Sequence, residues 1–277
     1  MRQGVERVRW LLGRIAAELG IIAIAGVVYV VVRKVTQGSP ETAIDNAHAL
    51  LRFEQAVNLD HEHAFQQLAL DSDWVRNAAN WMYIWGHWPV IICVAVALWF
   101  VHHTAYVRLR NAVFVSGMIG FLFFALMPMA PPRLAGLGYV DTVTQWSGSY
   151  RVMQPPQYTN IYAAMPSLHF GWDLLVGVTL FLSSTVLIVR IIGLALPIGM
   201  WFAVIATGNH WILDTVVAVG VVLVGAAIRE AARAYFAMRT ARSAGEKRRQ
   251  EAGIPVCVRT GGRDRAAART TARAHLP

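Results

Sequence analysis

The sequence is poor in charged residues and in cysteine. Charged side chains make up 15% of its 277 residues and hydrophobic ones 56%, which is too little polar surface for a single soluble core. Its only two cysteines, Cys93 and Cys257, exclude a fold held together by a disulfide framework. Acidic residues number 16 against 25 lysines and arginines, and most of the net charge of +9 lies near the C-terminus. This composition indicates a protein embedded in a membrane.

Six uncharged runs dominate the rest of the chain. They cover residues 19–32, 78–101, 111–132, 174–189, 191–213 and 215–228. A transmembrane helix needs about 20 residues, each rising about 1.5 Å. Three of the runs are long enough, and the other three reach this length when one flanking turn is added. The sequence therefore predicts an all-α polytopic membrane protein with a bundle of six transmembrane helices.

The basic residues predict the orientation of these helices. If the N-terminus is cytoplasmic, most lysines and arginines lie inside, near helix ends and in the C-terminal region. We therefore expect both termini in the cytoplasm and the protein in the plasma membrane. Residues 1–35 should form an uncleaved anchor helix, because no small-residue cleavage site follows the first run. Residues 229–277 should form a basic, largely disordered tail, and nucleic acid is not expected as a partner because aromatic residues do not interleave with the basic ones.

Residues 36–74 form a polar stretch that we expect outside the membrane. Ala49, Leu50, Phe53 and Val57 recur close to helical spacing, which predicts one or two amphipathic helices lying along the outer interface. Acidic residues and histidines of this stretch are expected on a solvated helix face and not in a metal site, because no ligand spacing recurs. They are Glu54, Asp60, His61, Glu62 and His63.

Two histidine-bearing segments stand where a polar loop gives way to an apolar run. They are residues 163–169, Ala-Ala-Met-Pro-Ser-Leu-His, and residues 208–214, Gly-Asn-His-Trp-Ile-Leu-Asp. In the first segment, Pro166 suits the opening turn of a helix, since its missing N–H would be unpaired there. Ser167 and His169 are therefore expected in that opening turn.

The second segment predicts a carboxylate beside an imidazole. Asn209 is typical of an N-cap, which places His210 at the start of a helix and Asp214 four residues later on the same face. Both histidines then lie at the outer ends of their helices, so we expect them to form one site. Two converging helix N-termini offer N–H groups and positive dipole ends to an anion such as phosphate. Imidazole can act there as a nucleophile or as a proton donor.

Other polar residues are predicted close to the same outer surface. Tyr83 and His87 lie four residues apart, and they form either a wall of the site or an interhelical hydrogen bond. Arg133 follows two prolines, and a rigidly placed phosphate clamp is favoured over a snorkelling side chain. The loop 134–162, which contains Arg151, is long enough to be a functional loop or a lid.

These segments resemble the type-2 phosphatidic acid phosphatase superfamily of integral membrane lipid phosphatases. The likeness covers roughly residues 52–220 and is carried by Met-Pro-Ser-Leu-His at 165–169 and His-Trp-Ile-Leu-Asp at 210–214. Leucine stands at Leu168, where the wider superfamily has glycine. This leucine, together with the settings of Tyr83 and His87, is most similar to the inositolphosphotransferase branch, which includes the inositol phosphorylceramide synthases.

The resemblance implies a metal-independent phosphotransferase or phosphatase without a cofactor, with residues 36–228 as its catalytic membrane domain. His210 would take up the phospho-headgroup as phosphohistidine, Asp214 would orient it, and His169 would protonate the leaving oxygen. The substrate would be a membrane lipid, a phosphate ester or phosphodiester, and the candidate acceptor is a polyol. The implied catalytic residues and the substrate-binding candidates are His210, His169 and Asp214, and Arg133, Ser167, Arg151, Tyr83 and His87.

The sequence also departs from the superfamily pattern. Ala203 and Val204 stand where the superfamily has Ser-Arg, and Leu126 stands where it has lysine. Two phosphate-binding cations are thus absent, which suits a phosphodiester better than a dianionic monoester. Arg151 is the candidate for replacing one of these charges. Asp173, four residues after His169, either tunes that histidine or pairs with another polar neighbour.

Other functions fit the pattern less well. Hydrolysis of phosphatidate or of a polyprenyl phosphate by water is the enzymatic alternative, and a transporter with a buried histidine relay is the non-enzymatic one. A serine protease is disfavoured, because Ser167 and His169 are two residues apart and point to different sides of a helix. Asp214 beside His210 favours anion chemistry over bis-histidine haem ligation. The sequence does not distinguish the lipid donor or the acceptor.

Overall fold

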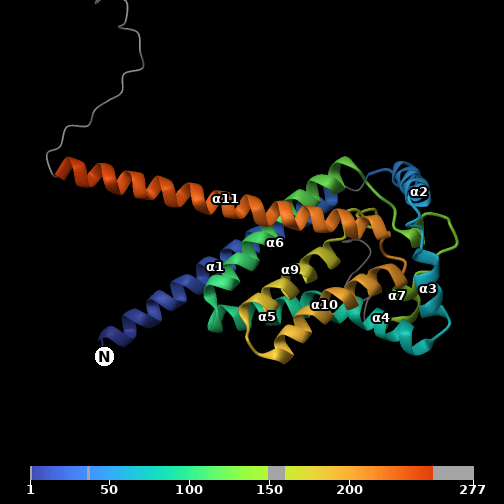
Figure 1. Cartoon of the computed structure of the whole chain (residues 1–277), viewed down its shortest axis with the longest axis horizontal. Coiled ribbons are helices and arrows are strands. Elements are labelled where there is room, and N and C mark those ends of the chain that lie inside the picture. Colours follow the sequence, from blue (N-terminus) through green and yellow to red (C-terminus); the bar gives the residue numbers. More distant parts are fainter. Residues whose placement is uncertain (1, 36–37, 149–159, 252–277) are drawn as a thin grey trace, which may run out of the picture. The chain divides into compact units, whose positions relative to one another are not determined.

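The computed structural model describes residues 2–35, 38–148 and 160–251 (Figure 1). Over this part the chain is helical and contains no strand, and an isolated backbone bridge joins Met129 to Ala163. The chain divides into two compact units, Met1–Arg229 and Glu230–Pro277. The elements are α1 (Arg2–Val35), α2 (Pro40–Ala56), α3 (Glu62–Leu70), α4 (Asp73–Trp85), α5 (Trp88–Val101), α6 (His103–Leu126), the 3-10 turn η1 (Pro132–Leu134), α7 (Thr142–Trp146), α9 (Leu168–Ser183), α10 (Leu187–Ala206) and α11 (Ile212–Glu251).

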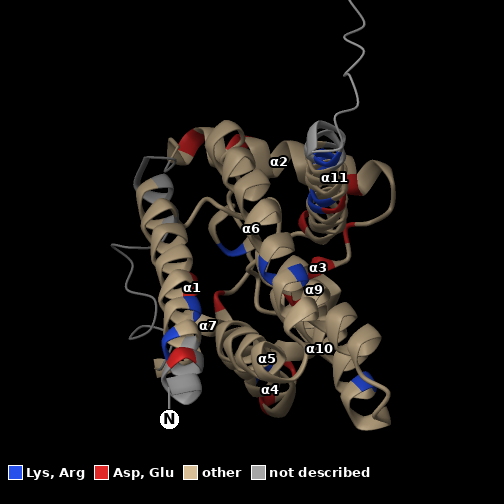
Figure 2. Cartoon of the chain, turned by 90° about the vertical axis from the view of Figure 1, so that its left-hand side faces the viewer, with Lys and Arg blue, Asp and Glu red and all other residues tan. Residues whose placement is uncertain are grey.

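Three described helices are long and apolar enough to cross a membrane. They are α6, α10 and the part of α11 from Ile212 to Ala241. The pair α4 and α5 would make a fourth, bent span, and α9 is apolar but only 16 residues long. Figure 2 shows these helices mostly in the colour of uncharged residues. The prediction of an all-α membrane protein is confirmed, whereas the count of six spans is not confirmed and stays a prediction.

The uncharged run 78–101 is broken instead of forming one helix. The two helices α4 and α5 meet at a bend of 49°. At the break, Gly86 lies so close to Met82 that an added Cβ would come within 2.5 Å of the Met82 carbonyl oxygen. His87 leaves helical geometry there, with φ −93° and ψ −98°. The side chain of His87 is buried, with 3% of its surface exposed.

The helix α1 packs against α6 through polar contacts. Glu18 forms an ion pair with Arg110 and accepts a hydrogen bond of 3.0 Å from the Tyr106 hydroxyl. Arg14 of α1 also contacts His103, the first residue of α6. Both Arg14 and Glu18 therefore join α1 to α6.

The helix α10 packs against α9, α4 and α3, and Figure 1 shows α9 and α10 side by side. At their crossing, a Cβ on Gly177 would lie 2.3 Å from the Gly193 carbonyl oxygen. Only glycine allows the two backbones to approach this closely. This contact holds α9 firmly against α10, and the loop after α10 leads directly to His210.

The polar stretch 36–74 forms two helices, as predicted, but the face that they bury shares only Leu50 with the predicted apolar stripe of α2. Phe53 and Val57, which belong to the predicted apolar stripe, are 54% and 45% exposed. Glu54 and Glu62 are fully buried, so the prediction of a solvated face is wrong for both carboxylates. The buried faces of α2 and α3 consist of Ala43, Ala47, Leu50 and Glu54, and of Glu62, Gln66 and Ala69.

Candidate active site

The two histidines that the sequence assigns to one site lie close together. The ring centroids of His169 and His210 are 6.0 Å apart, with their planes at 54°. The backbone joins the two segments as well, since the Ser167 N–H donates to the Asp214 carbonyl oxygen at 3.1 Å. His210 is 5% exposed, whereas His169 is partly exposed. The arrangement offers two imidazoles to one ligand.

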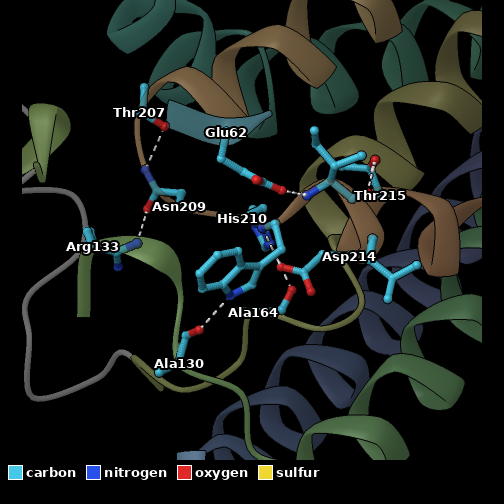
Figure 3. A network of polar contacts seen from close by, with 12 residues as sticks. Glu62, Ala130, Arg133, Ala164, Thr207, Asn209, His210, Asp214 and Thr215 are labelled. Atoms are coloured by element: carbon cyan, nitrogen blue, oxygen red, sulfur yellow. Dashed lines mark hydrogen bonds and ion pairs between the residues drawn. The ribbon is translucent and has the colours of Figure 1, made fainter. Parts of the chain in front are cut away.

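Two acceptors fix the ring of His210 (Figure 3). Its Nδ1 lies 2.8 Å from the Ala164 carbonyl oxygen and 3.3 Å from Oδ2 of Asp214. A carbonyl oxygen only accepts, so Nδ1 carries the hydrogen and Nε2 of the neutral ring keeps its lone pair. Asp214 lies where the i,i+4 spacing predicts, but the closer partner is a backbone carbonyl. No side-chain pattern in the sequence could have indicated that partner.

Protein carboxylates occupy the start of α11. Three consecutive backbone N–H groups there each donate to a buried carboxylate, so these three groups are not free to bind the phosphate predicted at this helix start. Ligand binding would require one of these bonds to break and leave a buried carboxylate unpaired. The pairs are Trp211 with Asp214 at 2.9 Å, Ile212 with Glu62 at 2.8 Å and Leu213 with Glu54 at 2.7 Å.

Asn209 is not the N-cap that its sequence position predicts. The helix begins at Ile212, and the amide of Asn209 instead donates to Thr207 Oγ1 at 2.8 Å and accepts from Arg133 (Figure 3). Nε of Arg133 also lies 3.1 Å from Oδ2 of Asp141, a partner that sequence reasoning missed. Arg133 therefore braces the loop that immediately precedes His210, and part of its charge is balanced by Asp141.

The start of α9 differs from its prediction by two residues. Pro166 precedes the helix, and Ser167 is an extended N-cap residue with φ −71° and ψ 90°. The reason is the bond from the Ser167 N–H to the carbonyl of Asp214, which holds Ser167 outside the helix. The Ser167 side chain is fully buried, and its Oγ has no hydrogen-bond partner among the described residues. Such a buried hydroxyl is suited to a ligand oxygen.

Tyr83 and His87 both lie against His169. The ring of Tyr83 stacks on that of His169 at a centroid distance of 4.6 Å, and the ring of His87 is 4.4 Å from it. Nδ1 of His87 lies 3.0 Å from Oδ1 of Asp173. Of the two roles left open for Asp173, pairing with a polar neighbour is the one found in the structure.

Glu54 and Glu62 form a buried acid pair beside α11. Burial raises the pKa of Glu54 to about 9, and the neighbouring carboxylate of Glu62 adds to the rise. Burial also raises the pKa of Glu62. The pair therefore holds a proton at neutral pH. The spacing of Glu54 from Ala43, Ala47 and Leu50 continues one helix face, and this signal could have revealed its burial.

The prediction for Arg151 is not tested, because this residue lies outside the described residues. Within the described parts of the chain, no group of three or more histidine, cysteine, aspartate or glutamate side chains is arranged to hold a metal ion.

The comparisons with known proteins identify the family of the chain. The search of curated proteins and the search of solved structures each found no match. A family model described as the PAP2 superfamily matches residues 48–228, a stretch that contains both histidine segments and both helices of the break at His87. This match does not distinguish the inositolphosphotransferase branch, which stays a prediction. Because the match covers more than half of the sequence, the chain belongs to the PAP2 superfamily, and its function is of the phosphatase or phosphotransferase type on lipid phosphates.

Proposed function

We propose that the protein transfers a phospho-headgroup from a membrane lipid to a polyol hydroxyl through a phosphohistidine on His210, at the outer membrane face. The observation that carries the proposal is the fixed ring of His210, held at Nδ1 by Ala164 and Asp214 with the ring of His169 at 6.0 Å. A nucleophile with an orienting partner on one side and an acid on the other is the arrangement that covalent catalysis requires.

In the first step, the lone pair on Nε2 of His210 attacks phosphorus, and the bond from phosphorus to the lipid oxygen breaks. The imidazolium of His169 gives its proton to that oxygen as it leaves. The His210 ring becomes positively charged, and the Asp214 carboxylate and the Ala164 carbonyl stabilise this charge. In the second step, an acceptor hydroxyl attacks phosphorus, the phosphorus–nitrogen bond breaks, and the hydroxyl proton passes to His169. Both histidines return to their starting forms.

Ser167 and Arg133 are the proposed partners of the phosphate oxygens. The buried Oγ of Ser167 lies at the N-cap of α9, two residues before His169. Arg133 shares its charge with Asp141, which suits a phosphodiester carrying one negative charge better than a monoester carrying two. The two imidazoles supply nucleophile and acid, so the proposal requires no metal cofactor.

The test offers the purified protein phosphatidylinositol, phosphatidate and a polyprenyl phosphate labelled with radioactive phosphorus, with and without inositol and with a metal chelator throughout. We expect an acid-labile label on His210 and transfer of the label to inositol. The variant His210→Ala should lose both, whereas the control His61→Ala, which changes an exposed histidine, should keep both. Transfer of the label only to water would support the plain phosphatase instead. Full turnover by His210→Ala would refute the proposed nucleophile.

A further inference from the structure

His169 lies between two imidazoles, each backed by a carboxylate. On one side is His210 at 6.0 Å, with Asp214 at its Nδ1. On the other side is His87 at 4.4 Å, with Asp173 at its Nδ1. The proposed transfer uses the first of these pairs and leaves the second without a role.

The second pair is deeply buried. Asp173 is fully buried and His87 is 3% exposed, and Oδ2 of Asp173 has no hydrogen-bond partner among the described residues. A buried carboxylate without a compensating positive charge is costly. The positive charge that could compensate Asp173 is a proton on His87 or on His169. The other neighbouring rings, Trp172, which stacks on His87, and Tyr83, are neutral.

We propose that Asp173 and His87 are positioning residues for the proposed transfer, on which this inference rests: the carboxylate balances the positive charge of a proton on His169, and the ring of His87, held by Asp173, packs against the ring of His169. The pair thereby keeps His169 supplied with the proton that the leaving oxygen needs. Two imidazolium rings in contact would repel each other, so the proposal places the single proton on His169 and not on His87. That proton leaves with the lipid oxygen in the first step, and the acceptor hydroxyl returns one in the second.

The ionisable and polar groups that face His169 come from each element packed around it. Asp173 lies one turn along the same helix, and the other elements contribute a phenol, two imidazoles and one further carboxylate. They are Tyr83 from α4, His87 from the break before α5, and His210 with Asp214 from the segment that opens α11. Asp173 is therefore the carboxylate placed to stabilise a proton on the side of His169 that faces away from His210.

The test compares two phosphodiesters over a range of pH. Phosphatidylinositol has an alkoxide leaving group that needs a proton, whereas bis(p-nitrophenyl) phosphate releases a phenolate that leaves without one. In Asp173→Asn, the alkaline fall of activity on phosphatidylinositol should begin about one pH unit lower, with an approximately tenfold loss above that point. The rate on bis(p-nitrophenyl) phosphate should stay within about twofold. His87→Asn, which keeps an N–H for Asp173 but does not titrate, should act in the same direction.

The controls separate this inference from the proposed function. Asp45→Asn, which changes an exposed carboxylate on α2, should leave both pH profiles unchanged. An equal loss on both substrates in Asp173→Asn, or an unshifted profile, would show a purely structural role and overturn the inference while His210 remains the nucleophile. Turnover of both substrates by His210→Ala, or of neither by the wild type, would instead defeat the proposed function, and the inference with it.

Discussion

At the start of α11, protein carboxylates accept hydrogen bonds from three consecutive backbone N–H groups. At the start of α9, by contrast, the N-cap hydroxyl of Ser167 is buried with no partner among the described residues. His210 beside the first start is almost fully buried, whereas His169 beside the second is partly exposed. Two segments with similar sequence signals therefore differ in which of their polar groups are paired within the protein.

We call the start of α11 closed, because its N–H groups have protein partners, and the start of α9 open, because the Ser167 hydroxyl has none among the described residues. The closed start fixes its backbone and the ring of His210, as the proposed nucleophile requires for a defined line of attack. The open start leaves a polar atom for the substrate. Phosphate recognition is thus expected at α9 and not at α11, and the following experiments test that division.

The largest effect is expected from Ser167→Ala at the open start. Ser167 is proposed to stabilise the transferring group, so loss of its hydroxyl should lower kcat/KM by about 100-fold. The melting temperature should not fall, because Oγ gives up no hydrogen bond within the described protein. The matched control is Ser39→Ala, which removes the N-cap bond of α2 to the Thr42 N–H and should cost about 1 kcal/mol of stability without slowing turnover. If Ser167→Ala melted earlier at an unchanged rate, the α9 start would be structural.

Glu62→Ala at the closed start should act mainly on stability. It leaves the buried Ile212 N–H unpaired, so the free energy of unfolding in detergent should fall by about 2 kcal/mol. Glu62→Gln, which keeps an acceptor oxygen, should recover most of this loss. Tighter binding of orthovanadate by Glu62→Ala than by the wild type would mean that the α11 start can serve as an anion site.

Glu54, which accepts a hydrogen bond at the closed start, should make the stability of the protein depend on pH. Its pKa rises from 4.5 to about 9 on folding, so the folded protein holds a proton that the unfolded chain releases. The stability of the wild type should therefore decrease as the pH rises from 4.5 to about 9. Glu54→Gln keeps an acceptor for Leu213 and does not titrate, so its melting temperature should exceed that of the wild type by a few degrees at the alkaline end of this range. Parallel melting curves for the two proteins at every pH would contradict the buried acid pair.

The smallest effect is expected from Asp141→Asn, which weakens the counter-charge on Arg133. More positive charge would then face the phosphate, so kcat/KM for phosphatidate relative to phosphatidylinositol should rise by about threefold, or about 0.7 kcal/mol. The control is Asp73→Asn, which weakens the ion pair between the exposed Asp73 and Arg76 and should leave this ratio unchanged. A loss of activity on both lipids would indicate that the Arg133–Asp141 pair chiefly braces the loop before His210.

Part of the site could be predicted from residue types alone. The convergence of His169 and His210, and the position of Tyr83 and His87 beside them, follow from polar residues at the ends of apolar runs. The burial of Glu54 and Glu62 was mispredicted because Phe53 and Val57 were taken as the apolar stripe at the membrane interface, which left the carboxylates on a solvated face. In a membrane protein, apolar side chains often face lipid, so hydrophobic spacing does not identify the face that packs inward.

The sequence by itself determined the all-α membrane class, because long uncharged runs can satisfy their backbone groups in lipid only as helices. It also marked His210 and His169 as the candidate nucleophile and acid. Only the tertiary structure decided which helix start is closed, where the run 78–101 breaks, and that Asp173 pairs with His87. These outcomes depend on contacts between distant parts of the chain, such as the Ile212 N–H and Glu62, which are 150 residues apart. No local pattern encodes a partner at that separation.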